Sequence, residues 1–149
     1  SAITSYARNF TIRAAQLNYH GINERGFIYA DTDSIHCDLL PSEVKGIRVH
    51  ESDFCAWKLE SNWDISYFTR QKTYIEHVTH EDGEKISEPY YNVKCAGMPQ
   101  KCKDTFVKSI ESGERSIADF KVGLKLAGKL RPKRIRGGIL LVDCDYEMR

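Results

Sequence analysis

The feature that most constrains the fold is a pair of alternating runs around Asp82–Gly83, in the stretch QKTYIEHVTHEDGEKISEPYYNVKCAG. Polar and apolar residues alternate on both sides of this dipeptide, as they do in strands with one buried face. An Asp-Gly pair between two such runs is a strong signal for a tight β-hairpin. The sequence therefore predicts antiparallel β-structure from Ile65 to Gly97.

Helical patterns lie before and after this hairpin. At the N-terminus, apolar residues recur at steps of three or four, which predicts an amphipathic helix. These residues are Ile3, Tyr6, Phe10, Ala14 and Leu17. No capping loop precedes this helix, so we expect the chain to be part of a longer protein. A second helix is predicted over residues 52–63, and a third between Pro99 and Gly113.

The remaining segments indicate strands. The stretch GFIYADTDSIHCDLL predicts a strand, a tight turn at Asp31 to Ser34 and a second strand. From Asp119 onward, three further strands are predicted in DFKVGL, KLRPKRIR and GILLVDCDYEM, with a break at Gly137–Gly138. The resulting order, α-β-β-α-β-β-α-β-β-β, predicts an α+β fold with antiparallel pairing.

Charge is distributed unevenly along the chain. Seven basic residues and no acidic residue lie between Phe120 and Val142, whereas the rest of the chain has 15 basic and 21 acidic residues, a balance of −6. We call the seven the basic stripe: Lys121, Lys125, Lys129, Arg131, Lys133, Arg134 and Arg136. Without interleaved carboxylates these charges repel one another. We therefore favour a face that binds a polyanion over a merely solvated surface.

Two further compositional features exclude classes of protein. The five cysteines are odd in number and form no C-x-x-C pair, which argues against a disulfide framework and against a structural zinc site. Reduced cysteines in an intracellular protein are the simpler interpretation. No apolar run approaches the roughly 20 residues of a membrane span, so no membrane partner is expected.

Asp31 and Asp33 are the strongest candidates for chemistry. In an extended segment, residues i and i+2 point to the same side, so the two carboxylates would be presented together. Two ionised carboxylates at such close range repel one another unless a cation lies between them. Magnesium binds one or two carboxylates together with substrate phosphates, so it is the expected counter-ion. This is the electrostatic arrangement of two-metal phosphoryl transfer.

Three other interpretations of this D-x-D remain open on the motif alone. The first is an acidic β-turn with no ligand. The second is a calcium loop, which is disfavoured because the acidic alternation stops and the sixth position is not Gly. The third is a metal-dependent nucleotide-sugar transferase, since such enzymes also use a D-x-D with a metal.

The neighbouring motifs favour one family. YADTDSI resembles the motif C hairpin of family-B DNA polymerases, and RQKTYIE resembles the K-x-Y motif of the same family, with Lys72 and Tyr74. The segments VKCAGMPQK and FKVGLKLAGKLRPKRIRGGILLVDCDY are similar to the thumb of the protein-primed bacteriophage branch. The resemblance is ordered and covers nearly the whole chain.

The resemblance implies a role for each matching position. Asp33 matches the metal-coordinating palm aspartate, and Asp31 matches its partner in the acidic site. Lys72 and Tyr74 match residues that hold the primer-template near the primer 3′ end, and as positions i and i+2 of a strand they would share one face. The residues that would face duplex DNA from the thumb are Lys129, Arg131, Lys133 and Arg134.

For the whole chain, the resemblance implies an α+β fold with an antiparallel palm hairpin and packed helices over residues 1–95, followed by a small β-rich thumb over residues 96–149. The other palm aspartate, the fingers helix and the exonuclease of the family lie upstream and are absent from this sequence. We therefore expect the C-terminal fragment of a DNA-directed DNA polymerase, inactive on its own.

The complete enzyme is expected to work in the cytoplasm of a bacterial host. Its expected partners are Mg²⁺ at a two-metal site completed by the absent upstream aspartate, primer-template DNA, dNTPs and a terminal priming protein. The alternative from another class is a non-catalytic module that binds nucleic acid.

Overall fold

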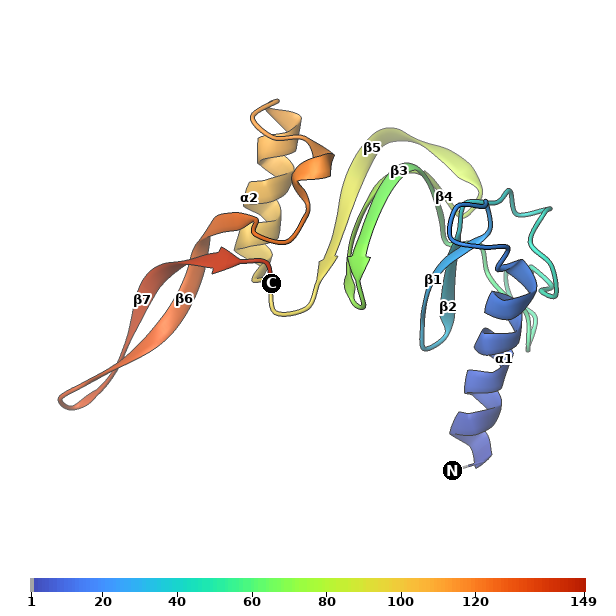
Figure 1. Cartoon of the computed structure of the whole chain (residues 1–149), viewed down its shortest axis with the longest axis horizontal. Helices are drawn as coiled ribbons and strands as arrows, with labels where there is room; N and C mark the ends of the chain where they lie inside the picture. The colour runs from blue at the N-terminus through green and yellow to red at the C-terminus, as the bar shows by residue number, and fades with distance from the viewer. Residues whose placement is uncertain (1) are drawn as a thin grey trace. The chain divides into compact units, whose positions relative to one another are not determined.

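The computed structural model describes residues 2–149, which separate into two compact units. The first unit contains the described residues up to Asn62 together with residues 80–86, and the second contains residues 63–79 together with 87–149. Along the chain (Figure 1) the elements are α1 (Ala2–Asn18), β1 (Phe27–Asp31), β2 (Ser34–Cys37), β3 (Ser61–Arg70), β4 (Thr73–Glu81), β5 (Glu84–Cys95), α2 (Gln100–Glu111), the 3-10 helix η1 (Ile117–Asp119), β6 (Lys125–Ile135) and β7 (Gly138–Glu147).

In the first unit, α1 lies beside the antiparallel β1–β2 hairpin (Figure 1). The predicted N-terminal helix is confirmed, but the residues it buries are Thr11, Ala14 and Asn18 rather than its large apolar ones. The Asn18 amide donates to the carbonyls of Ala14 and Lys45, at 2.7 and 2.9 Å, and Asn18 Oδ1 accepts from the Lys45 amide at 2.7 Å. Polar contacts thus attach the following loop to α1.

The strands β3, β4 and β5 form one sheet in that order. Two-residue turns join neighbouring strands at residues 71–72 and 82–83, and turns of that length connect antiparallel strands. Asp82 and Gly83 both have positive φ, 49° and 83°, as a primed hairpin turn requires. The predicted Asp82–Gly83 hairpin is therefore confirmed.

The hydrophobic core lies in the second unit, between α2, η1, the end of β5 and the proximal part of the β6–β7 hairpin. The helix predicted after Pro99 is confirmed, with Pro99 as its N-cap residue. Phe106 of α2 and Phe120 are both fully buried, and their ring centres lie 5.8 Å apart. The core residues are Ile75, Val93, Cys95, Met98, Cys102, Phe106, Ile117, Phe120, Leu124, Leu126, Tyr146 and Met148.

The helix predicted over residues 52–63 is wrong. This segment is a loop that forms one parallel bridge between Val49 and Trp57, and β3 begins at Ser61. Cys55 has a left-handed φ of 57°, which no α-helix accommodates. The Trp57 ring instead stacks on Phe10 of α1, with 5.5 Å between ring centres and 9° between planes. A tertiary contact therefore replaces the expected helical face.

The strand predicted at DFKVGL is also wrong. Residues 117–119 form η1, in which Ser116 and Asp119 make a reciprocal capping box. Gly123 follows with a φ of 92°, and its amide donates to the carbonyl of Met148. These local hydrogen bonds satisfy the backbone without a strand partner. Among the described residues, no helix has the length and apolar character needed to cross a membrane.

Candidate functional site

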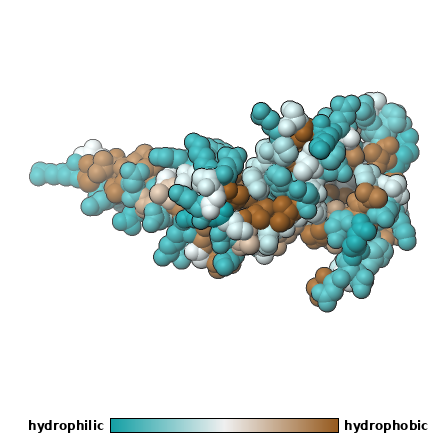
Figure 2. Space-filling model, turned by 90° about the horizontal axis from the view of Figure 1, so that it is seen from above, coloured by the Kyte–Doolittle hydropathy of each residue, from teal (hydrophilic) through white to brown (hydrophobic). Residues whose placement is uncertain are grey.

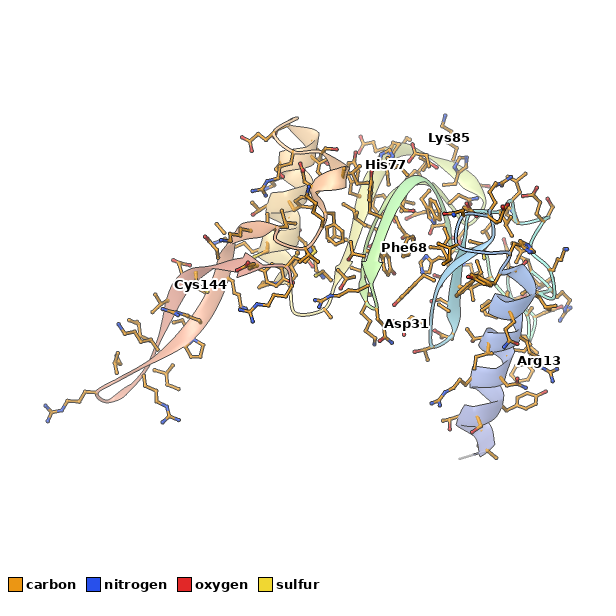
Figure 3. The ribbon with its side chains drawn as sticks, viewed as in Figure 1. Arg13, Asp31, Phe68, His77, Lys85 and Cys144 are labelled. Atoms are coloured by element: carbon orange, nitrogen blue, oxygen red, sulfur yellow. The ribbon has the colours of Figure 1, made fainter. Side chains whose placement is uncertain are left out.

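The acidic pair lies at the tip of the β1–β2 hairpin, where Figure 3 labels Asp31. Asp31 is the last residue of β1, it pairs with Ser34 of β2, and Thr32 and Asp33 form the loop between them. The predicted turn is confirmed, but the extended-segment geometry considered for Asp31 and Asp33 does not apply, because Thr32 between them has a left-handed φ of 51°. A β-branched residue rarely adopts this conformation, and such strain concentrates at functional sites.

Hydrogen bonds hold this turn in place from several sides. The Thr32 hydroxyl donates to Asp31 Oδ1 at 3.0 Å, and the Tyr29 hydroxyl donates to Asp31 Oδ2 at 3.5 Å. The Ser34 hydroxyl donates to the Asp31 carbonyl at 3.1 Å. From α1, the Thr11 hydroxyl donates to the Thr32 carbonyl at 2.9 Å. The Asp31 carboxylate is therefore oriented by its own hairpin, and the hairpin tip is attached to α1.

The donor chemistry of this tip fits a hard divalent cation. Asp31 is half-buried and Asp33 is exposed, so the tip offers carboxylate oxygens at the surface. Within residues 2–149, no group of three or more His, Cys, Asp or Glu side chains is placed to hold a metal ion. One or two carboxylates are enough for Mg²⁺ where substrate phosphates and water complete its shell. The magnesium site at Asp31 and Asp33 stays a prediction.

The K-x-Y residues lie at the β3–β4 turn. Lys72 is in the turn itself, with a left-handed φ of 56°, and its carbonyl accepts a hydrogen bond from the Ala96 amide at 3.0 Å. Tyr74 is in β4 and only 9% exposed, and its ring stacks on Phe68 with 5.0 Å between ring centres. The expectation that both share one strand face is wrong, because Lys72 precedes the strand. Their predicted role in holding the primer-template remains untested by this geometry.

Most of the basic stripe lies on the β6–β7 hairpin, whose side chains Figure 3 draws on either side of the ribbon. In the register of the two strands, the partners of Lys129, Arg131 and Lys133 are Cys144, Val142 and Leu140. Because side chains alternate along a strand, these three cations share one face, whereas Arg134 lies on the other. The four predicted thumb residues are therefore not all on the same face.

A β-bulge at Gly128 is the feature that sequence reasoning missed. Ala127 pairs with Asp145 and Lys129 pairs with Cys144, so Gly128 is an extra residue in β6. Its φ is 112°, a conformation that favours glycine. A single inserted residue reverses the alternation, so Lys129 faces the opposite way from Ala127. An isolated glycine within a strand pattern was the available signal.

Sequence comparison relates the chain to DNA polymerases of bacteriophages. No family model matches it. It is 35% identical over 158 residues to the DNA polymerase of Bacillus phage B103, which covers 99% of this chain and 25% of that polymerase. It is 33% identical over 147 residues to the DNA polymerase of Streptococcus phage Cp-1, covering 99% of the chain and 22% of the relative.

Solved structures give the same relationship. Phi29 DNA polymerase complexed with primer-template DNA and incoming nucleotide substrates matches with a TM-score of 0.72 and 34% identity, over 99% of this chain and 25% of that one. The binary complex of the same polymerase with primer-template DNA matches with a TM-score of 0.71 and 33% identity. The chain spans about a quarter of the length of the relatives it matches.

Proposed function

Because the chain is homologous to the DNA polymerases of phi29-type bacteriophages over 99% of its length, we propose that it is the C-terminal part of a protein-primed DNA polymerase. The observation that carries this proposal is the β1–β2 hairpin with Asp31 and Asp33 at its tip, within a chain that matches these polymerases from end to end. Residues 1–95 would contribute to the palm, and residues 96–149 would form the thumb.

The reaction of the complete enzyme would be nucleotidyl transfer to a primer 3′ end. Asp33 and Asp31 would hold Mg²⁺ together with an aspartate from outside this chain. When bound, the ions would favour the deprotonated form of the primer 3′-hydroxyl and stabilise the negative charge on the leaving pyrophosphate. The hydrogen bonds from Thr32 and Tyr29 would fix the orientation of the Asp31 carboxylate.

A polymerase must also bind DNA independently of its sequence. Lys and Arg side chains provide such binding by contacting the phosphates. Lys72 would meet a phosphate from the β3–β4 turn. Tyr74 would hold the primer-template from β4, because its ring is fixed in place by stacking on Phe68. Lys129, Arg131, Lys133 and Arg134 are the candidates on the thumb.

DNA binding is tested by fluorescence anisotropy of a labelled primer-template titrated with the purified chain. Neutralising four phosphates gives a salt slope of about −3.6, so affinity should fall roughly a hundredfold between about 50 and about 200 mM salt. The fall should be similar for unrelated DNA sequences. Absence of binding at about 50 mM salt would contradict the thumb assignment.

Activity of the chain alone is tested by primer extension with Mg²⁺ and all four dNTPs. We expect no extension, because the described residues supply two carboxylates and no third ligand beside them. Nucleotide incorporation by the rigorously purified chain would overturn the fragment proposal. Binding without extension is also what a non-catalytic module would give, so a second observation is needed.

That second observation is the reading frame upstream of this chain. An aspartate-bearing strand and a Lys-rich fingers helix in that frame would support the polymerase. A start codon directly before α1 would favour a separate nucleic-acid-binding module. The nucleotide-sugar transferase alternative draws no support from the polymerase relatives or from the hairpin setting of the acidic pair.

A further inference from the structure

The buried face of α1 is made of small and polar residues. Thr11, Ala14 and Asn18 are its buried residues, and their spacing of three and four places them on one side of the helix. Large apolar residues of the helix, such as Ile3 and Leu17, are exposed instead. Figure 2 shows hydrophobic residues among hydrophilic ones at the surface of the first unit, at the right of the view. The buried face of α1 therefore offers hydrogen-bonding groups rather than a large apolar area.

The hydroxyl of Thr11 bonds outside its own helix. A threonine within a helix commonly donates back to a carbonyl three or four residues earlier, as Thr105 of α2 does to the Lys101 carbonyl at 2.8 Å. Thr11 instead donates to the Thr32 carbonyl, 21 positions further along the chain, at 2.9 Å. Thr11 is only 7% exposed, so water competes little for this bond. The bond therefore links α1 to the loop between the two aspartates.

The accepting carbonyl belongs to the peptide that joins Thr32 to Asp33. The left-handed φ of Thr32 is unfavourable for a β-branched residue, and such a conformation persists only where the surroundings hold it. The Thr32 hydroxyl is bonded to Asp31 Oδ1, and the peptide that follows is bonded to Thr11. Rotation of this peptide would move Asp33 relative to Asp31. The bond from Thr11 therefore restrains the relative position of the two carboxylates.

We propose that Thr11 is a positioning residue for the magnesium site at Asp31 and Asp33, an inference that rests on the proposed function. Mg²⁺ demands near-ideal octahedral geometry, so it binds well only when both carboxylates are correctly placed. The apparent affinity for an ion falls in proportion to the fraction of molecules in the binding-competent conformation. Thr11 is not a ligand in this arrangement. It acts through the peptide between Thr32 and Asp33, whose conformation it stabilises.

Thr11→Val tests this role, because it removes the hydroxyl and keeps a side chain of similar shape. In the complete polymerase containing this chain, single-turnover nucleotide incorporation is measured over a range of Mg²⁺ concentrations. Loss of one hydrogen bond should raise the Mg²⁺ concentration for half-maximal incorporation roughly three- to tenfold, and saturating Mg²⁺ should restore the parent rate. Thr11→Ser, which keeps the hydroxyl, should behave like the parent. So should Thr105→Val, the same substitution at an exposed position of α2.

A second measurement needs neither metal nor activity. In NMR spectra of the purified chain, the amide resonances of Thr32 and Asp33 should shift in Thr11→Val. The three-bond coupling between the amide and Hα protons of Thr32 should also change, because this coupling reports φ. Neither change should occur in Thr105→Val. Thr11→Ala also lacks the hydroxyl and should give the same results, which keeps the test decisive where valine disturbs the packing of α1.

The outcomes separate this inference from the function on which it rests. Unchanged resonances of the turn in Thr11→Val and Thr11→Ala would overturn the positioning role and leave the polymerase assignment standing. A loss of incorporation that saturating Mg²⁺ does not correct would do the same. Full incorporation by Asp33→Asn would instead contradict the proposed metal site, and with it this role for Thr11, whatever the NMR spectra show.

Discussion

Lys129 Nζ lies 5.6 Å from the centre of the Tyr146 ring, across the two strands of the β6–β7 hairpin. Tyr146 belongs to the hydrophobic core, and its hydroxyl lies 3.3 Å from Cys95 Sγ. This contact exists because the Gly128 bulge turns Lys129 to the face of Tyr146. The same bulge therefore brings Lys129, one of the predicted DNA-contacting cations, into contact with a core residue.

Tyr146 predicts a loss of stability in alkali. Burial first, and then the hydrogen bond with Cys95, raises the pKa of the Tyr146 phenol to about 12, whereas an unfolded tyrosine has a pKa of about 10. The stability from this neutral phenol is complete below about pH 10 and is lost as pH rises through about 12. The free energy of unfolding, measured by urea denaturation between pH 9 and pH 12, should therefore fall more steeply for the parent chain than for Tyr146→Phe. The exposed Tyr6→Phe should behave like the parent; parallel pH curves for Tyr146→Phe and the parent would contradict the prediction.

Gly128→Ala is expected to destabilise the hairpin. A Cβ at this position meets the Lys101 side chain at 3.2 Å, and the φ of 112° disfavours any L side chain. We expect a loss of roughly 1–3 kcal/mol in the free energy of unfolding. Gly138→Ala is the matched control in the same hairpin, because its added Cβ meets nothing within 4 Å. Similar melting temperatures for the two variants would show that the bulge tolerates a side chain.

The elements that sequence reasoning found are those set by neighbours along the chain. Asp82–Gly83 supplies both positive-φ residues of its own turn, and Pro99 precedes α2 where a helix tolerates it. The missing elements depend on distant residues. Trp57 stacks on Phe10, which is far away in the sequence, and this contact removed the reason for a helix over residues 52–63.

The candidate site divides in the same way. The identity of Asp31 and Asp33 as a hairpin-tip pair follows from the local sequence, and the strand–turn–strand unit is confirmed. The side of the strand on which each side chain lies could not be predicted from the local sequence, because it depends on single residues with left-handed φ. Thr32 and Lys72 interrupt the alternation assumed for the two motifs, and Gly128 reverses it within β6. The rule that side chains alternate holds only along a regular extended strand, and the backbone is irregular at each of these three residues.

Asn18→Ala should loosen the first unit. The Asn18 side chain is fully buried and makes three hydrogen bonds, to the Ala14 carbonyl and to both backbone groups of Lys45. Its removal takes away all three of these hydrogen bonds, two of which attach the loop at Lys45 to α1, with an expected loss of about 2 kcal/mol in the free energy of unfolding. Hydrogen exchange should show faster exchange at the Lys45 amide. Asn9→Ala, an exposed position on α1, is the control, and equal exchange in both variants would argue against an anchoring role.

Asp33→Asn should separate catalysis from DNA binding. In the complete polymerase containing this chain, loss of the carboxylate that we propose holds Mg²⁺ should reduce nucleotide incorporation on the order of 10³-fold, since such ions supply several kcal/mol of charge stabilisation. Primer-template affinity should stay within about twofold, because the exposed Asp33 supports no core contact. Asp145→Asn, which changes an exposed carboxylate of β7, should leave incorporation unchanged. Single-turnover extension and anisotropy on the same preparations measure both quantities. Full incorporation by Asp33→Asn would remove this residue from the metal site, whereas a parallel loss of DNA affinity would point to a folding defect.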